Sequence, residues 1–137
     1  MKTIVVGYED TPAAKRALER AAELARAFGS TVIVTSVASV VASPGRSEGA
    51  IDPTDTPAEH QAELQAAGAK LSAAGVHAEL VPAVGHPADT IAELAGQRAA
   101  DLIVVGGGEA SLVQRLLGQS VSEAVAHKAA CDVLIVH

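Results

Sequence analysis

Three successive glycines, Gly106, Gly107 and Gly108, follow an apolar run of Val and Ile in this chain. Glycines at such a turn let the backbone approach a phosphate group, and N–H groups at a helix N-terminus can donate hydrogen bonds to it. The next residue, Glu109, carries a carboxylate that repels phosphate. Two like charges about 4 Å apart repel by about 1 kcal/mol in water and by several times more when partly buried. The turn therefore has the glycines of a phosphate site and a charge that opposes phosphate.

The hydroxyl of Ser120 has two explanations. Ser120 and Glu123 form an S-x-x-E capping box, in which the serine side chain accepts a hydrogen bond from the helix backbone. The same hydroxyl could instead bind a phosphate at the start of that helix. Because caps of this kind are common, helix capping alone is the simpler interpretation and phosphate binding is the alternative.

Other chemistry finds little support in the sequence. Glu9, Asp10 and Glu109 could together hold Mg²⁺ or Ca²⁺, but solvated acids near helix N-termini are the simpler interpretation. The histidines lack the spacing of a zinc site, and the lone Cys131 is expected to be a small buried hydrophobic residue. No Ser or Cys lies in a G-x-S-x-G nucleophile turn. We therefore expect neither a metal site nor catalytic residues, and no enzymatic activity.

The composition of the 137 residues argues against several partners. The net charge is -6 and the chain has one Phe, one Tyr and no Trp, whereas nucleic-acid-binding proteins need a basic face and usually aromatic platforms. No apolar run approaches the roughly 18 residues that a membrane span needs. The N-terminus lacks the long apolar region and cleavage site of a secretory signal. We expect a cytoplasmic protein that binds neither nucleic acid nor membrane.

Short β-branched runs alternate with Ala-rich amphipathic segments along the chain. Thr11 and Thr56 each precede a proline, which is a typical helix start, and Gly29 is a typical helix end. The apolar stripe of the first helix is predicted to be Ala14, Leu18, Ala21, Ala25 and Phe28. The patterns predict strands over 3–8, 30–37, 76–84, 101–106 and 131–137, and helices over 11–29, 56–75, 86–99 and from Ser120.

Strands that alternate with helices predict an α/β fold, a three-layer sandwich with a five-stranded, mainly parallel sheet in one domain over 1–137. Ligands of such sheets bind beyond the carboxyl ends of the strands, where the strand order reverses. The runs 3–7 and 101–106 both end in Gly and lead into turns, so we expect them to be the central pair that frames the site. The segment 39–55 is rich in Gly, Pro and Ser, so we expect it to be mobile or to act as a flap.

Four motifs, IVVGYEDTP, GHPADTI, DLIVVGG and RLLGQSVSEAVAHKAACDVLIV, resemble those of the single-domain universal stress proteins. The resemblance covers nearly the whole chain. It implies a Rossmann-like sheet of the adenine nucleotide alpha hydrolase type, a homodimer, and a regulatory role in stress tolerance. The apolar strand predicted at 132–137 would promote aggregation if it formed an unpaired edge of the sheet. A second copy that pairs antiparallel with it about a two-fold axis would cover this edge in both copies.

The same family contains members that bind ATP and members that do not, and the pattern G-x-x-G-x9-G-[ST] marks those that do. Gly106 and Ser120 match this pattern, whereas Glu109 and Gln119 replace its second and third glycines. By resemblance, Glu9 takes the place of an acid that contacts the nucleotide, and Val37 the place whose backbone binds adenine. The tentative nucleotide-binding residues are therefore Glu9, Val37, Gly106, Gly107, Gly108, Gln119 and Ser120.

These observations support two functions. The first is a non-enzymatic, stress-response regulatory dimer that binds nucleotide weakly or not at all, needs no cofactor and acts through protein contacts. The alternative is a switch that binds ATP or AMP through 106–108 and Ser120, with slow or no hydrolysis. Glu109 and Gln119 are the residues on which the choice depends.

Overall fold

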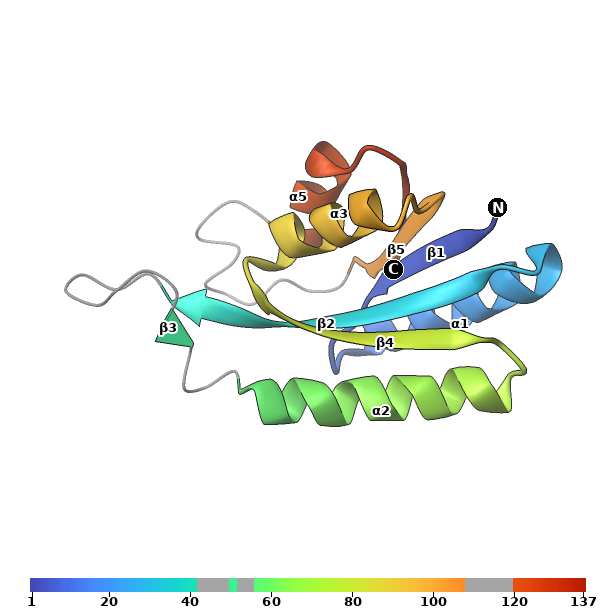
Figure 1. Ribbon diagram of the computed structural model, residues 1–137, viewed down its shortest axis with the longest axis horizontal. Coiled ribbons are helices and arrows are strands. Elements are labelled where there is room, and N and C mark those ends of the chain that lie inside the picture. The colour runs from blue at the N-terminus through green and yellow to red at the C-terminus, as the bar shows by residue number, and fades with distance from the viewer. Residues whose placement is uncertain (42–49, 52–55, 108–119) are drawn as a thin grey trace.

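The chain folds around a sheet of parallel strands, as Figure 1 shows. The computed structural model describes residues 1–41, 50–51, 56–107 and 120–137. Parallel strands run in the order β4–β2–β1–β5–β6, and a two-residue strand, β3, pairs antiparallel with the end of β2. The strands are β1 Thr3–Gly7, β2 Thr31–Val41, β3 Ala50–Ile51, β4 Ala78–Gly85, β5 Leu102–Gly106 and β6 Asp132–Val136. The predicted α/β fold with five parallel strands is confirmed.

Helices cover both faces of the sheet. In the described residues, α1 (Pro12–Phe28) and α2 (Pro57–Ala73) lie on one face, and α3 (Pro87–Gln97) and α5 (Val121–Lys128) lie on the other (Figure 1). Successive strand side chains point to opposite faces, so each strand contributes to two apolar cores. Val6 packs with Leu18 under α1, whereas Val5 packs with Ile91 under α3. This is the three-layer arrangement that the sequence predicts.

Local signals start and end the helices. The Thr11 hydroxyl accepts a hydrogen bond from Ala14 N at 3.1 Å, and the Thr56 hydroxyl accepts one from Glu59 N at 3.3 Å. Gly29 ends α1 with a φ of 68°, a left-handed conformation that glycine adopts without strain. The predicted caps are therefore confirmed. The predicted stripe of α1 is buried apart from Phe28, which is the last helical residue and stays 58% exposed at the turn to β2.

The strand order reverses between β1 and β5. From β1 the chain goes to β2 and then to β4 on one side, and it returns to β5 and β6 on the other. The register pairs Gly7 of β1 with Thr35 of β2 and with Val105 of β5. β1 and β5 are thus the central pair, as predicted, and their carboxyl ends define the place where a ligand is expected.

One predicted connection contains regular structure. The segment 39–55 was expected to be mobile or a flap, but β2 continues through Val41, because Ser39 pairs with Gly85 of β4 and Val40 pairs with Ile51 of β3. Residues 39–41 and 50–51 are therefore strand residues, and the mobility or flap role of this segment stays a prediction. Residues 42–49 and 52–55 lie outside the described part of the chain. None of the helices in the described residues combines the length and the apolar character that a membrane span requires.

Candidate functional site

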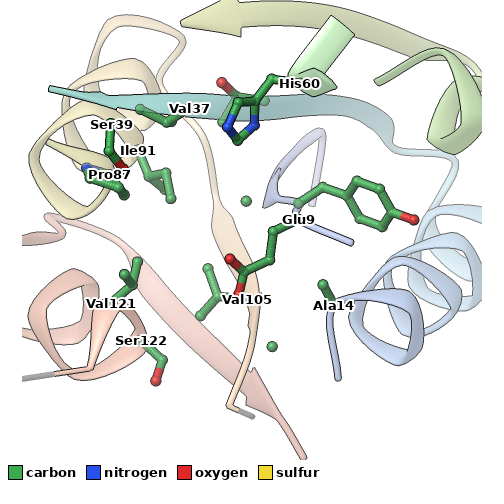
Figure 2. A pocket seen from close by; sticks show the side chains of 14 residues that line it. Glu9, Ala14, Val37, Ser39, His60, Pro87, Ile91, Val105, Val121 and Ser122 are labelled. Atoms are coloured by element: carbon green, nitrogen blue, oxygen red, sulfur yellow. The ribbon is translucent and has the colours of Figure 1, made fainter. Parts of the chain in front are cut away.

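A pocket opens at the carboxyl ends of β1 and β5, where the strand order reverses (Figure 2). It lies between the extended end of β2 and the first turns of α2, α3 and α5. The hollow has a volume of about 130 Å³ and is open to solvent at its mouth. The fold therefore places a hollow where α/β sheets usually bind ligands.

The end of β2 presents its backbone to this pocket. Thr35 O accepts a hydrogen bond from Tyr8 N at 2.9 Å, so the backbone groups of Thr35 face β1. Backbone groups of every second strand residue face the same side, so those of Val37 and Ser39 also face that side. The pairing of β2 with β1 ends at Gly7↔Thr35. Val37 and Ser39 therefore extend past the end of β1 along the pocket wall. Val37 therefore lies on the β2 wall of the pocket, and its contact with adenine stays a prediction.

Apolar side chains form two further walls. Ile91 of α3 and Val105 of β5 are buried at the bottom of the pocket, and Val121 at the start of α5 lies at one side. Figure 2 shows Val37 and Ile91 on the same side of the hollow. Apolar surfaces of this kind suit a flat ring, because they bury its faces and leave its polar edge to the backbone.

Glu9 brings a negative charge to the pocket. Figure 2 shows its carboxylate directed into the space between β2 and α5. The backbone of Glu9 also forms the turn that starts α1, because Glu9 O accepts a hydrogen bond from Thr11 N at 2.9 Å. Among the described lining residues there is no Lys or Arg, so an anionic ligand would depend on N–H groups and hydroxyls.

Ser120 acts as the cap that the sequence predicts. Its hydroxyl accepts a hydrogen bond from Glu123 N at 3.2 Å and lies 3.2 Å from the hydroxyl of Ser122. Ser122 is 8% exposed and lines the pocket beside Val121. Ser122 was not predicted as a site residue, although its position in the first turn of α5 is a signal that could have identified it. Ser122 and the start of α5 thus border one side of the pocket, whereas Ser120 lies behind Ser122 and is not a lining residue.

The glycines have different surroundings. Gly106 lines the pocket, and a Cβ there would lie 2.6 Å from Ala14 N at the start of α1. A Cβ on Gly107 would lie 2.4 Å from Ile135, and Gly107 N donates a hydrogen bond to Val136 O at 2.7 Å. Gly107 therefore packs against β6. Gly108, Glu109 and Gln119 lie outside the described residues.

A buried polar cluster next to the pocket was not predicted. The Ser36 hydroxyl bonds His60 Nδ1 and donates to the Glu63 carboxylate at 3.0 Å, and the Glu63 carboxylate lies 3.3 Å from His60 Nδ1. His60 lines the pocket, and Figure 2 shows its ring extending into the hollow from the side of β2. Nothing in the sequence marks this cluster, because Ser36 and His60 are 24 residues apart. The fold alone brings them together.

Tyr8 is a titratable residue that lines the pocket. Burial raises the pKa of the Tyr8 phenol above its ordinary value of 10.0, and nearby Lys15 partly opposes this. Tyr8 therefore stays neutral at physiological pH. Asp10, which was weighed as a cation ligand, pairs with Lys15 at 3.2 Å. Among the described residues, no group of three His, Cys, Asp or Glu side chains is arranged to hold a metal ion.

Cys131 packs partly buried beneath α3 and α5 and lies outside the pocket. Burial raises the pKa of its thiol, so the thiolate is disfavoured. This agrees with a packing role.

A sequence profile described as the Universal stress protein family matches residues 1–137. The chain belongs to the universal stress protein family. Universal stress protein Rv1636 of Mycobacterium tuberculosis is 33% identical over 147 residues, covering 99% of this chain and 96% of that protein. The family that the sequence motifs suggested is thereby confirmed.

Solved structures of the universal stress protein family share the fold. A universal stress protein in complex with cAMP is 33% identical, with a TM-score of 0.76 over 99% of this chain and 97% of that one. A universal stress protein from Archaeoglobus fulgidus in complex with dAMP is 26% identical, with a TM-score of 0.73 over 100% of this chain and 98% of that one. In both structures the similar protein is thus in complex with an adenine nucleotide that carries one phosphate.

Proposed function

We propose that this universal stress protein is a non-enzymatic, regulatory protein that binds an adenine nucleotide with a single phosphate, such as AMP or cAMP. The nucleotide lies in the pocket at the ends of β1 and β5, with its base beside β2 and its phosphate beside the start of α5. The observation that carries the proposal is the position of this pocket at the strand-order reversal, where Val37 and Ser122 line it and the Ser120 hydroxyl lies 3.2 Å from that of Ser122.

The β2 side suits the base. The Val37 backbone faces the pocket past the end of β1, and it can donate to and accept from the polar edge of adenine. Val37 and Ile91 supply apolar contacts for the ring faces. The complexes of similar proteins with cAMP and dAMP support this choice of base.

The α5 side suits one phosphate better than three. The N–H groups at the start of α5 and the hydroxyl of Ser122 are the donors on this side. The described lining residues include no Lys or Arg that would neutralise a triphosphate, and Glu9 adds a negative charge. In the sequence, Glu109 and Gln119 replace two glycines of the pattern typical of ATP-binding members. A longer phosphate chain therefore meets more repulsion and fewer donors.

Titration calorimetry of the purified protein with cAMP, AMP, ADP and ATP plus Mg²⁺ tests the proposal. We expect AMP or cAMP to bind at least about 5-fold more tightly than ATP, which corresponds to about 1 kcal/mol of charge repulsion. The absence of heat with every nucleotide at millimolar concentration would contradict the proposal. Tighter binding of ATP than of AMP would instead favour the alternative, an ATP-dependent switch.

A backbone variant tests the position of the base. Val37→Pro removes the N–H that faces the pocket, while the residues that pair with β4 on the other side of β2, Ser36 and Ala38, keep theirs. We expect Val37→Pro to weaken AMP binding by tenfold or more, whereas Val37→Ala keeps the N–H and should change it about threefold or less. Equal losses in the two variants would show that the Val37 backbone does not bind the base.

A further inference from the structure

Thr35 has a side-chain hydroxyl that is fully buried and makes no hydrogen bond. Thr35 is 0% exposed, and its Oγ1 is the sole buried side-chain oxygen or nitrogen without a partner in the described part of the chain. A buried hydroxyl without a partner destabilises the folded state, because its hydrogen bonds to water are lost and not replaced. Such a group therefore requires an explanation.

Packing does not explain the hydroxyl. Ile33 and Val37, two residues before and after Thr35 on β2, point to the same face of the sheet and are apolar. Valine has nearly the same shape as threonine, forms strands equally well and would leave no polar atom unsatisfied. A valine at position 35 would thus fit the core better in the absence of a ligand.

The position of Thr35 gives the hydroxyl a use. Thr35 is one of the residues that line the pocket, and it forms the last β1–β2 pair, two residues before Val37. Figure 2 shows Val37 and His60 on the β2 side of the pocket and Val121 and Ser122 on the opposite side. A ligand with its phosphate at α5 would therefore place its nucleoside part against β2.

We propose that the Thr35 hydroxyl hydrogen-bonds the nucleoside part of the bound nucleotide and thereby positions its base on β2. This inference rests on the proposed function. It assigns Thr35 as a residue that determines nucleoside affinity, and it explains why an unsatisfied hydroxyl is kept in the core. The free protein is less stable because of it, and the ligand supplies the missing partner.

The test uses three variants that differ in the hydroxyl. Thr35→Val removes the hydroxyl and keeps the shape, Thr35→Ser keeps the hydroxyl, and Thr31→Val makes the same change at the far end of the same strand. We expect Thr35→Val to raise the unfolding midpoint of the ligand-free protein by a few degrees. The same variant should weaken the binding of AMP, cAMP and adenosine by the same factor, about tenfold. Thr35→Ser and Thr31→Val should bind within about twofold of wild type.

The opposite signs of the two effects distinguish this role from a structural one. If Thr35→Val binds AMP as tightly as wild type, the inference is wrong while the proposed function stands. A lower unfolding midpoint for ligand-free Thr35→Val also overturns it, because the hydroxyl would then have a partner in the free protein. If wild type binds none of the three ligands, the proposed function and this inference fail together.

Discussion

Gly106 is required by the approach of helix α1. A Cβ at this position would lie 2.6 Å from Ala14 N and 2.7 Å from Ala13 C, and these backbone atoms cannot move aside as the end of a side chain can. A glycine that serves helix packing and one that serves a phosphate look the same in a sequence, because both permit close backbone approach. The glycines alone therefore do not identify a phosphate site. The hydroxyls and N–H groups at the start of α5 carry that argument.

A measurement of stability alone tests whether Gly106 is needed for packing against α1. We expect Gly106→Ala to lower the free energy of unfolding by about 1–3 kcal/mol, because the added Cβ overlaps the α1 backbone. The control is Gly96→Ala in α3, where no atom lies within 4 Å of the added Cβ. It should raise the free energy by about 0.5–1 kcal/mol, as alanine favours a helix over glycine. Urea denaturation measures both, and a neutral Gly106→Ala would contradict the packing explanation.

Glu109 and Gln119 lie outside the described residues, so their effect is predicted from the sequence. Replacing both by Gly restores G-x-x-G-x9-G-S. Relief of charge repulsion and steric hindrance worth about 1–3 kcal/mol would tighten ATP binding roughly 5- to 150-fold.

Calorimetry on the two single variants and the double variant checks this prediction. Adenosine serves as the control ligand, because the gain acts on phosphate and should leave the nucleoside unchanged. An ATP affinity that does not rise in the double variant would mean that the pocket disfavours a triphosphate for another reason.

The elements with local signals are those that the sequence predicts well. Thr11, Thr56 and Ser120 cap their helices as expected, because each cap bonds a backbone N–H three residues away. Features that depend on distant residues were missed. β2 extends to Val41 because β3 and β4 pair with its end. Thr35, which lines the pocket, and Ser36, which lies next to it, acquire their surroundings only from the fold, so the base side of the site could not be predicted beyond Val37.

Asp101 joins the starts of the two central strands. Its carboxylate accepts hydrogen bonds from Lys2 N at 2.7 Å and from Thr3 N at 3.0 Å. The bond from Thr3 is the larger cause, and together they lower the pKa of Asp101 below its ordinary value of 3.8. The ionised carboxylate is therefore favoured in the folded state. It stabilises the fold above the unfolded pKa, and that stabilisation is lost as the pH falls through the lower, folded pKa.

Asp101→Asn tests this junction between β1 and β5. The variant should melt a few degrees below wild type at pH 7, and the difference should shrink as the pH falls below about 4. Glu23→Gln is the control, because it removes only an exposed pair with Arg20 on α1 and should change the melting temperature little. Thermal melts followed by circular dichroism across pH 2–7 decide it. A difference between wild type and Asp101→Asn that stays constant with pH would contradict the role of the charge.

At the scale of the whole molecule, the two edges of the sheet differ. Just before β4, His77 O accepts a hydrogen bond from Val32 N of β2. Every second residue from His77 onward therefore faces β2, and Pro82 of β4 falls at a position that faces outward. Proline has no N–H to donate, which protects this edge from pairing. On β6, Gly107 N donates to Val136 O, so Val133, Ile135 and His137 face outward with their N–H groups. The β6 edge is thus the one that is suited to pair with another strand.

We therefore expect a homodimer in which two β6 strands pair antiparallel through 132–137 about a two-fold axis. One contact then covers the β6 edge of each protomer. Ile135→Pro should weaken the dimer, since it removes an outward N–H and leaves the groups of Val136 that pair with β5. Val136→Pro is the matched control, because its N–H faces β5 and its loss should lower the melting temperature of the fold itself. Sedimentation at micromolar concentrations gives the outcome. A monomeric wild type, or a dimeric Ile135→Pro as tight as wild type, would rule out pairing through this edge.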